Sequence, residues 1–235
     1  MRAVRTAGLT AFVGDVDRLE FGAAPLRRNL EDLDWLDRTA RAHHAVIEAI
    51  AERCPVVPMR LATVYASDEG VAGMLRQRAP DLRETLSRLR ARREWGVKAF
   101  AAEPADMSGT PGDPHAGRVT AATGPGATYL QRRRAQLTAA ECGRQQAMAG
   151  ARAVHAELGR LAVSGRLYPP QAPELAGQPG RMLLNAAYLV ADARAETFAA
   201  AIAGLTARHR SVRLVVTGPW PAYSFVGEQQ AEAQR

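Results

Sequence analysis

Histidines and cysteines are the side chains in this sequence best suited to hold a metal ion. His43 and His44 are adjacent in a stretch with helical spacing, where their side chains point about 100° apart, so they cannot chelate one ion as an i, i+4 pair could. Cys54 and Cys142 form no C-x-x-C pair, and no Cys/His zinc spacing occurs in the chain. We therefore expect no metal and no cofactor, with His43 a hydrogen-bonded core residue beside a more exposed His44.

Catalytic and nucleotide-binding signatures are absent from the sequence. None of G-x-S-x-G, H-E-x-x-H or G-x-x-x-x-G-K-[ST] is found. An enzyme would then need a site that the fold assembles from scattered residues such as Glu94, Lys98 and His43. We predict that the protein is not an enzyme and keep this assembled site as an alternative.

The only compact basic run is Arg132-Arg133-Arg134, in a chain of net charge +7. A nucleic-acid interface would pair such a run with aromatic side chains, and only Tyr129 is close in sequence. Consecutive residues of a helix fan out around its axis, which favours a solvated helix face. A nucleic-acid-binding protein remains the alternative function, although we expect no nucleic acid as partner.

Aromatic residues concentrate near the C-terminus, although they make up only 6% of the chain. Residues 217–226 contain two prolines and three aromatics, which makes the segment rigid and apolar. Trp220, Tyr223 and Phe225 are therefore our candidate residues, either for packing the C-terminal strand onto the core or for binding a partner.

Hydrophobic spacing predicts the elements that position these residues. In the first half, the pattern indicates two helices broken at Pro80, with Ser67 as N-cap of the first, and a further helix over residues 36–52. Short β-branched or alternating runs predict strands over residues 9–13, 56–61 and 94–101.

In the second half, a long proline-free stretch predicts one helix over residues 127–163. Its apolar residues follow a 4-3-4-3 spacing that gives a narrow seam: Ala147, Ala151, Val154, Leu158 and Leu161. A strand over 182–190, an alanine-rich helix over 195–207 and a strand over 212–216 follow.

Glycine and proline density places the domain boundaries. Residues 103–125 are rich in both and predict a flexible linker between a domain over 1–102 and a second α+β domain over 126–227, with a frayed tail over 228–235. With 47% apolar and 23% charged residues, the chain has the composition of a folded protein. Two cysteines, no signal peptide and no run of about 18 apolar residues predict a cytoplasmic protein without a membrane span.

Several segments resemble, in the same order, the gas vesicle protein L and gas vesicle protein F family. The C-terminal aromatic segment is similar to the family's terminal motif, and the resemblance covers about residues 8 to 226. The other similar segments are His43 with Val46 and Ile47, Pro55 to Arg60, Glu94 to Lys98, Tyr129-Leu130 with Arg132 to Arg134, and Asn185 to Val190.

This resemblance implies a two-domain α+β fold with a ferredoxin-like N-terminal domain, and no catalytic residues. It implies an accessory role in gas vesicle assembly, in which the protein binds the hydrophobic shell subunit as a chaperone or nucleator and meets other accessory proteins, at the gas vesicle or in the cytoplasm. Two departures stand out: the family's further N-terminal strand is missing, and Leu61-Ala62 replaces a Phe-Gly pair.

Overall fold

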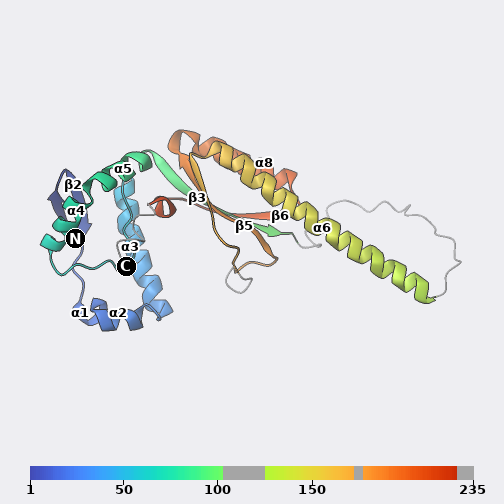
Figure 1. Cartoon of the computed structure of the whole chain (residues 1–235), viewed down its shortest axis with the longest axis horizontal. Helices are drawn as coiled ribbons and strands as arrows, with labels where there is room; N and C mark the ends of the chain where they lie inside the picture. The colour runs from blue at the N-terminus through green and yellow to red at the C-terminus, as the bar shows by residue number, and fades with distance from the viewer. Residues whose placement is uncertain (103–124, 172–176, 227–235) are drawn as a thin grey trace. The chain divides into compact units, whose positions relative to one another are not determined.

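The computed structural model describes residues 1–102, 125–171 and 177–226 (Figure 1). The chain forms two compact units. Unit 1 comprises Met1–Glu94 together with Trp220–Arg235, and unit 2 comprises Trp95–Pro219. The predicted linker and C-terminal tail lie almost entirely outside the described residues.

Unit 1 begins with an antiparallel hairpin of β1 (Arg2–Thr6) and β2 (Leu9–Val13), in which Arg2 pairs with Val13 and Thr6 with Leu9. The two-residue turn Ala7-Gly8 has positive φ at both positions, as a type I′ turn requires. The predicted strand over 9–13 is confirmed as β2, and β1 is its partner.

Five helices of unit 1 follow the hairpin: α1 (Arg18–Phe21), α2 (Ala23–Asn29), α3 (Leu33–Ala51), α4 (Asp68–Gln77) and α5 (Ala79–Leu89). The predicted helix over 36–52 is confirmed as α3, which is capped by the Asp32 side chain. The Ser67 cap is also confirmed, since its hydroxyl accepts from the Gly70 N–H at the start of α4. A small core joins the hairpin to α4 and α5 through Leu9, Leu75, Ala79 and Leu82.

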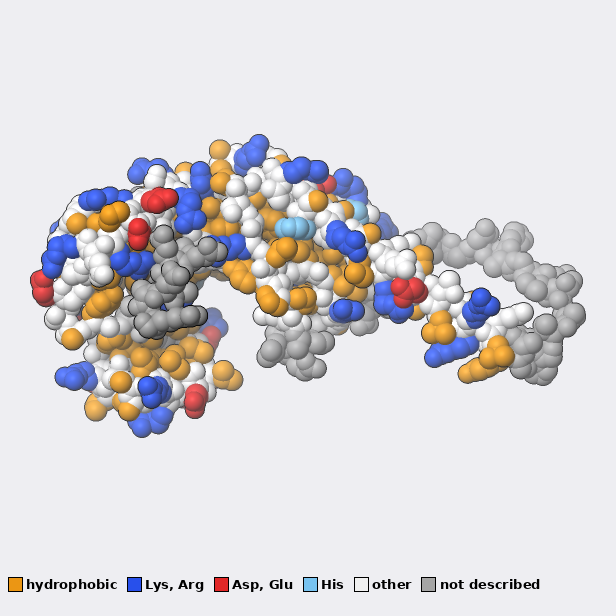
Figure 2. All heavy atoms as spheres, viewed as in Figure 1, with side chains coloured by type: hydrophobic (Ala, Val, Ile, Leu, Met, Phe, Trp, Pro, Cys, Tyr) orange, Lys and Arg blue, Asp and Glu red, His pale blue; other side chains and the backbone are white. Residues whose placement is uncertain are grey.

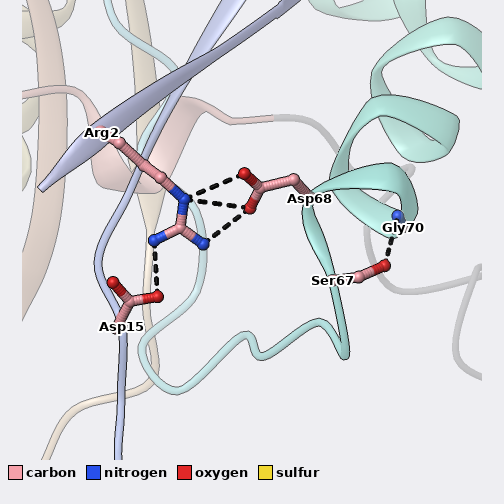
Figure 3. Close-up of polar contacts among 5 residues, drawn as sticks. All are labelled: Arg2, Asp15, Ser67, Asp68 and Gly70. Carbon is pink, nitrogen blue, oxygen red and sulfur yellow. Dashed lines mark hydrogen bonds and ion pairs between the residues drawn. The ribbon is translucent and has the colours of Figure 1, made fainter.

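Arg2 holds the hairpin against the start of α4 (Figure 3). Its Nε and Nη2 donate to the two Asp68 carboxylate oxygens at 2.9 and 2.7 Å, and its Nη1 donates to Asp15 at 2.6 Å. The guanidinium lowers the pKa of the Asp68 carboxyl, chiefly through these hydrogen bonds.

The strand predicted over residues 56–61 is wrong. This segment has no regular secondary structure and belongs to no sheet. Pro55 and Pro58 have no N–H to donate, which removes ladder hydrogen bonds along the run. One of its carbonyls instead hydrogen bonds to a side chain of α3: Met59 O lies 3.0 Å from His43 Nε2.

Unit 2 contains a four-stranded sheet in the order β4-β5-β3-β6. Its elements follow the chain order β3 (Arg92–Ala101), α6 (Pro125–Leu161), β4 (Ser164–Leu167), β5 (Met182–Ala191), α8 (Ala195–Arg208) and β6 (Val212–Trp220). This is a β-α-β-β-α-β arrangement, the ferredoxin-like pattern. Strands β4 and β5 are antiparallel, and short 3-10 turns, η2 (Asp192–Arg194) and η3 (Tyr223–Phe225), follow β5 and β6.

The α+β class is confirmed, but the position of the ferredoxin-like domain and the predicted boundary at residue 102 are corrected. The strand β3 was expected to complete an N-terminal sheet, whereas it lies between β5 and β6 in the sheet of unit 2. Val97 and Ala99 of β3 are fully buried in the core of that unit. The alternating pattern predicts the strand β3, which is confirmed, but its neighbours β5 and β6 begin only at Met182 and Val212, and no local pattern encodes that pairing.

Helices α6 and α8 lie together on one face of this sheet (Figure 1). The predicted long helix is confirmed, and four of its five seam residues are buried there: Ala147, Ala151, Val154 and Leu158. Phe198 of α8 and Tyr188 of β5 fill the same core, with ring centroids 5.7 Å apart. The Tyr188 hydroxyl is satisfied by His155 Nδ1 at 2.8 Å.

Candidate partner-binding surface

The aromatic segment after β6 is fixed to unit 1 by a carboxylate. Glu94 accepts from the Ser224 backbone N–H at 2.7 Å and from the Ser224 hydroxyl at 2.6 Å. Ser224 lies in η3, the short 3-10 turn that also carries Tyr223 and Phe225. Because one side chain satisfies two donors of this turn, the backbone of the segment is held in one conformation.

The three predicted aromatic residues have different environments. Phe225 is buried, together with the neighbouring Ala222. Trp220 and Tyr223 keep 39% and 38% of their surface exposed. Phe225 therefore anchors the segment, whereas the other two rings are available in part to a partner.

His44 on α3 supports the two exposed rings. Its ring meets Trp220 edge-on, with centroids 5.2 Å apart, and lies 5.8 Å from the Tyr223 ring. Its Nδ1 lies 2.8 Å from the Tyr223 hydroxyl, a hydrogen bond, and Glu48 lies 3.9 Å from its Nε2. We refer to His44, Trp220 and Tyr223 as the aromatic cluster.

Burial raises the pKa of the Tyr223 hydroxyl, and the nearby Glu48 and Glu94 carboxylates raise it further. The phenol therefore stays protonated at neutral pH. In this state it can act as hydrogen-bond donor or acceptor to His44, while 38% of the residue's surface stays exposed.

The three residues named for an assembled catalytic site each have another hydrogen-bond partner. Glu94 is engaged by Ser224, His43 by Met59 O, and the Lys98 ammonium by Gln171 at 2.9 Å. Lys98 belongs to unit 2, whereas Glu94 and His43 belong to unit 1. Among the described residues there is no group of three metal-ligating side chains either.

The basic run lies in the first half of α6, where Arg133 and Arg134 are exposed. The side chain of Arg132 falls outside the described part of the structure. Of the described helices, none is long and apolar enough to cross a membrane.

Sequence reasoning missed His44 as the support of the aromatic cluster and Glu94 as its clamp. His44 and Tyr223 are separated by 179 residues, and Glu94 and Ser224 by 130. A polar residue on a helix and a glutamate at a strand start carry no signal for partners so distant. The clue available was that Glu94 and the aromatic segment both belong to the family resemblance.

Fold and sequence together define the class of protein: residues 1–227 match the family described as gas vesicle synthesis protein GvpL/GvpF. The chain belongs to this family, and it is a gas vesicle synthesis protein. The expectation of a non-enzymatic protein agrees with that description.

Individual relatives agree with this assignment. The chain is 42% identical to gas vesicle protein L of Streptomyces sp. (strain CB03234) over 96% of its own length and 83% of the relative's. It is 30% identical to gas vesicle protein F of the same strain, over 83% of the chain and 80% of the relative. The crystal structure of the gas vesicle protein GvpF from Anabaena sp. PCC7120 is similar in fold, with a TM-score of 0.56, 19% identity and coverage of 81% of this chain and 75% of that one.

Proposed function

We propose that this protein binds the hydrophobic shell subunit of the gas vesicle in the cytoplasm and covers its apolar surface until the subunit is incorporated. A subunit with one apolar face self-associates unless a partner shields that face. An accessory protein of gas vesicle synthesis can supply this shielding without catalysis, alone or with other accessory proteins.

The observation that carries the proposal is the partial exposure of Trp220 and Tyr223 on a rigid support. Tryptophan and tyrosine are enriched among residues that dominate binding energy at protein interfaces. Glu94, Phe225 and His44 already fix the segment and its rings, so binding a partner requires little further ordering. A pre-ordered aromatic pair beside a buried anchor fits an apolar partner.

The test is co-expression of the affinity-tagged chain with the shell subunit, followed by pull-down at low and high salt. Apolar capture predicts soluble shell subunit that stays bound at high salt, because screening weakens charge contacts and leaves hydrophobic ones in place. Replacing Trp220 and Tyr223 together by alanine should abolish recovery of the subunit. Recovery that disappears at high salt, or recovery of nucleic acid instead, would contradict the proposal.

Tyr168 provides the matched control. It is 41% exposed, close to the 38% of Tyr223, but lies just after β4 in unit 2. Tyr168→Ala should leave recovery of the shell subunit unchanged. Equal losses in Tyr168→Ala and Tyr223→Ala would show that the aromatic cluster has no special role.

A further inference from the structure

Helix α6 is packed along only part of its length. Its last four turns carry the buried seam under the sheet and α8, whereas every described residue from 129 to 142 is exposed. At about 1.5 Å per residue, this free part of α6 is about 20 Å long. Figure 1 shows it running beyond the end of the sheet and of α8 within unit 2.

The seven-residue spacing of the buried seam recurs in the free part of α6. Leu130 and Leu137 are seven residues apart, as Ala151 and Leu158 are, with Arg144 at the position between these two pairs, and Ala140 stands seven residues before Ala147. A seven-residue apolar repeat is the pattern by which one helix packs against another. Leu130 and Leu137 are exposed, so this half of the repeat lacks the cover that its second half has.

Small residues lie beside the face of Leu130 and Leu137, on the side toward the buried seam. A Cβ added at Gly143 would meet nothing within 4 Å, and Ala140 lies one turn before it. A partner helix could therefore lie close to α6 here without displacing atoms. An isolated stretch of this length is marginal as a helix in water, and packing of one face is the usual source of its stability.

The charge on the free part of α6 indicates which kind of partner helix would fit it. Arg144 is paired with Glu141 on its own helix, whereas Arg133 and Arg134 have no acidic partner among the described residues. Figure 2 shows basic and apolar side chains next to each other on this part of the molecule. A second copy of α6 would place arginines against arginines in a parallel alignment, and also in an antiparallel alignment that packs Leu130 on Leu137, which disfavours self-association in these registers.

We infer that the free part of α6 is a docking site for an acidic amphipathic helix of a partner protein, with Leu130 and Leu137 as apolar anchors and Arg133 and Arg134 as the charged rim. This surface lies in unit 2 and is distinct from the aromatic cluster in unit 1. The inference does not rest on the proposed binding of the shell subunit.

The experiment uses the full chain and a fluorescently labelled three-heptad peptide with leucine at its a and d positions and glutamate at e and g. Anisotropy titration should show binding, and a matched peptide with lysine in place of glutamate should bind at least about tenfold more weakly. Equal binding of the two peptides would overturn the inference.

Single substitutions locate the site. Leu137, 56% exposed, can become glutamate without burying charge, and Leu167 of β4, 61% exposed, is the matched control. Leu137→Glu should weaken peptide binding at least about tenfold, and Leu167→Glu should leave it unchanged, with circular dichroism confirming that both variants are folded. Similar effects of the two substitutions would contradict docking on α6.

Two further outcomes would assign this surface differently. A dimer in sedimentation that Leu137→Glu dissociates would show that a second copy covers it. Tight binding of a labelled DNA duplex that is lost in the Arg133→Glu, Arg134→Glu variant, without peptide binding, would make it a nucleic-acid interface. Either result would overturn the inference.

Discussion

At the scale of single residues, the C-terminal aromatic segment combines a core anchor with two partly exposed rings. The sequence left open whether Trp220, Tyr223 and Phe225 pack the core or bind a partner. Their burial divides these roles between different residues of one segment.

Phe225→Ala should lower the free energy of unfolding by about 3–5 kcal/mol, because it empties a buried aromatic site. Trp220→Ala should cost only about 1–2 kcal/mol, since a large part of that ring remains in contact with water. Urea denaturation measures both values. Equal costs for the two substitutions would show that Trp220 is as much a core residue as Phe225.

Glu94→Ala should cost about 1–3 kcal/mol, because the Ser224 N–H and hydroxyl lose their acceptor. Glu94→Gln retains one side-chain oxygen and should cost less. Urea denaturation of both variants tests whether alanine lowers the free energy of unfolding more than glutamine does. A larger loss in the glutamine variant would indicate that the contact with Ser224 is not the main role of Glu94.

At the scale of elements, the sequence pattern predicts each strand or helix separately, whereas the tertiary structure shows which of them pair. The pair β3 and β6 is an example, since the Ala102 N–H donates to Ser211 O at one end and Gly96 faces Thr217 at the other. Their opposite running directions make this pair antiparallel. Close packing at Gly96 offers a direct test of the pairing.

Gly96→Ala should destabilise the protein by about 1–3 kcal/mol, because the added Cβ would lie 2.5 Å from the Thr217 hydroxyl oxygen. Thr217→Gly, which removes that hydroxyl, should recover part of the loss when combined with Gly96→Ala. The double-mutant cycle, followed by thermal melting, measures this coupling. Additive effects would argue against direct contact between the two positions.

The link between the β1–β2 hairpin and α4 should depend on pH. Arg2 lowers the pKa of Asp68 below its ordinary value of 3.8, so the stability that this contact provides is present above about pH 4 and is lost as pH falls through the lowered pKa. At pH 7 the wild-type protein should have a higher melting temperature than the Asp68→Asn variant. This difference in melting temperature should shrink below pH 4. A constant difference across this range would exclude the ion pair as its cause.

At the scale of the whole molecule, a large buried cluster lies in unit 2. It buries Tyr188, Phe198 and Leu158 completely, together with residues from three strands and two helices, whereas the cluster joining the hairpin to α4 and α5 has four buried side chains, none of them aromatic. Amide hydrogens exchange most slowly where opening exposes most apolar surface.

Hydrogen exchange should therefore be slowest in β3, β5 and the second half of α6. Amides of residues 129–142 should exchange much faster than those of residues 147–158 in the same helix, because every side chain that the structure describes in the first group is exposed. Mass spectrometry of peptides from α6 measures the contrast. Uniform protection along the helix would mean that its first half is covered in solution.

The sequence alone determined much of what is local. The seam of α6, the break between α4 and α5 and the Ser67 cap follow from side-chain spacing and cap chemistry, which act within a few residues. The order of the motifs along the chain indicated the family, because each motif consists of a few neighbouring residues that are recognisable without the fold. Proline chemistry also explains why no strand forms at 56–61, although the β-branched run there favours one.

Only the tertiary structure decided which sheet contains β3 and which residues surround Trp220 and Tyr223. Strand pairing depends on which apolar faces bury each other, and the faces that cover Val97 and Ala99 come from segments far along the chain. The contacts of Glu94 and His44 with the aromatic segment likewise join residues more than a hundred positions apart. Side-chain exposure is a property of packing, so the division of the aromatic segment into an anchor and two accessible rings could not be deduced from residue types.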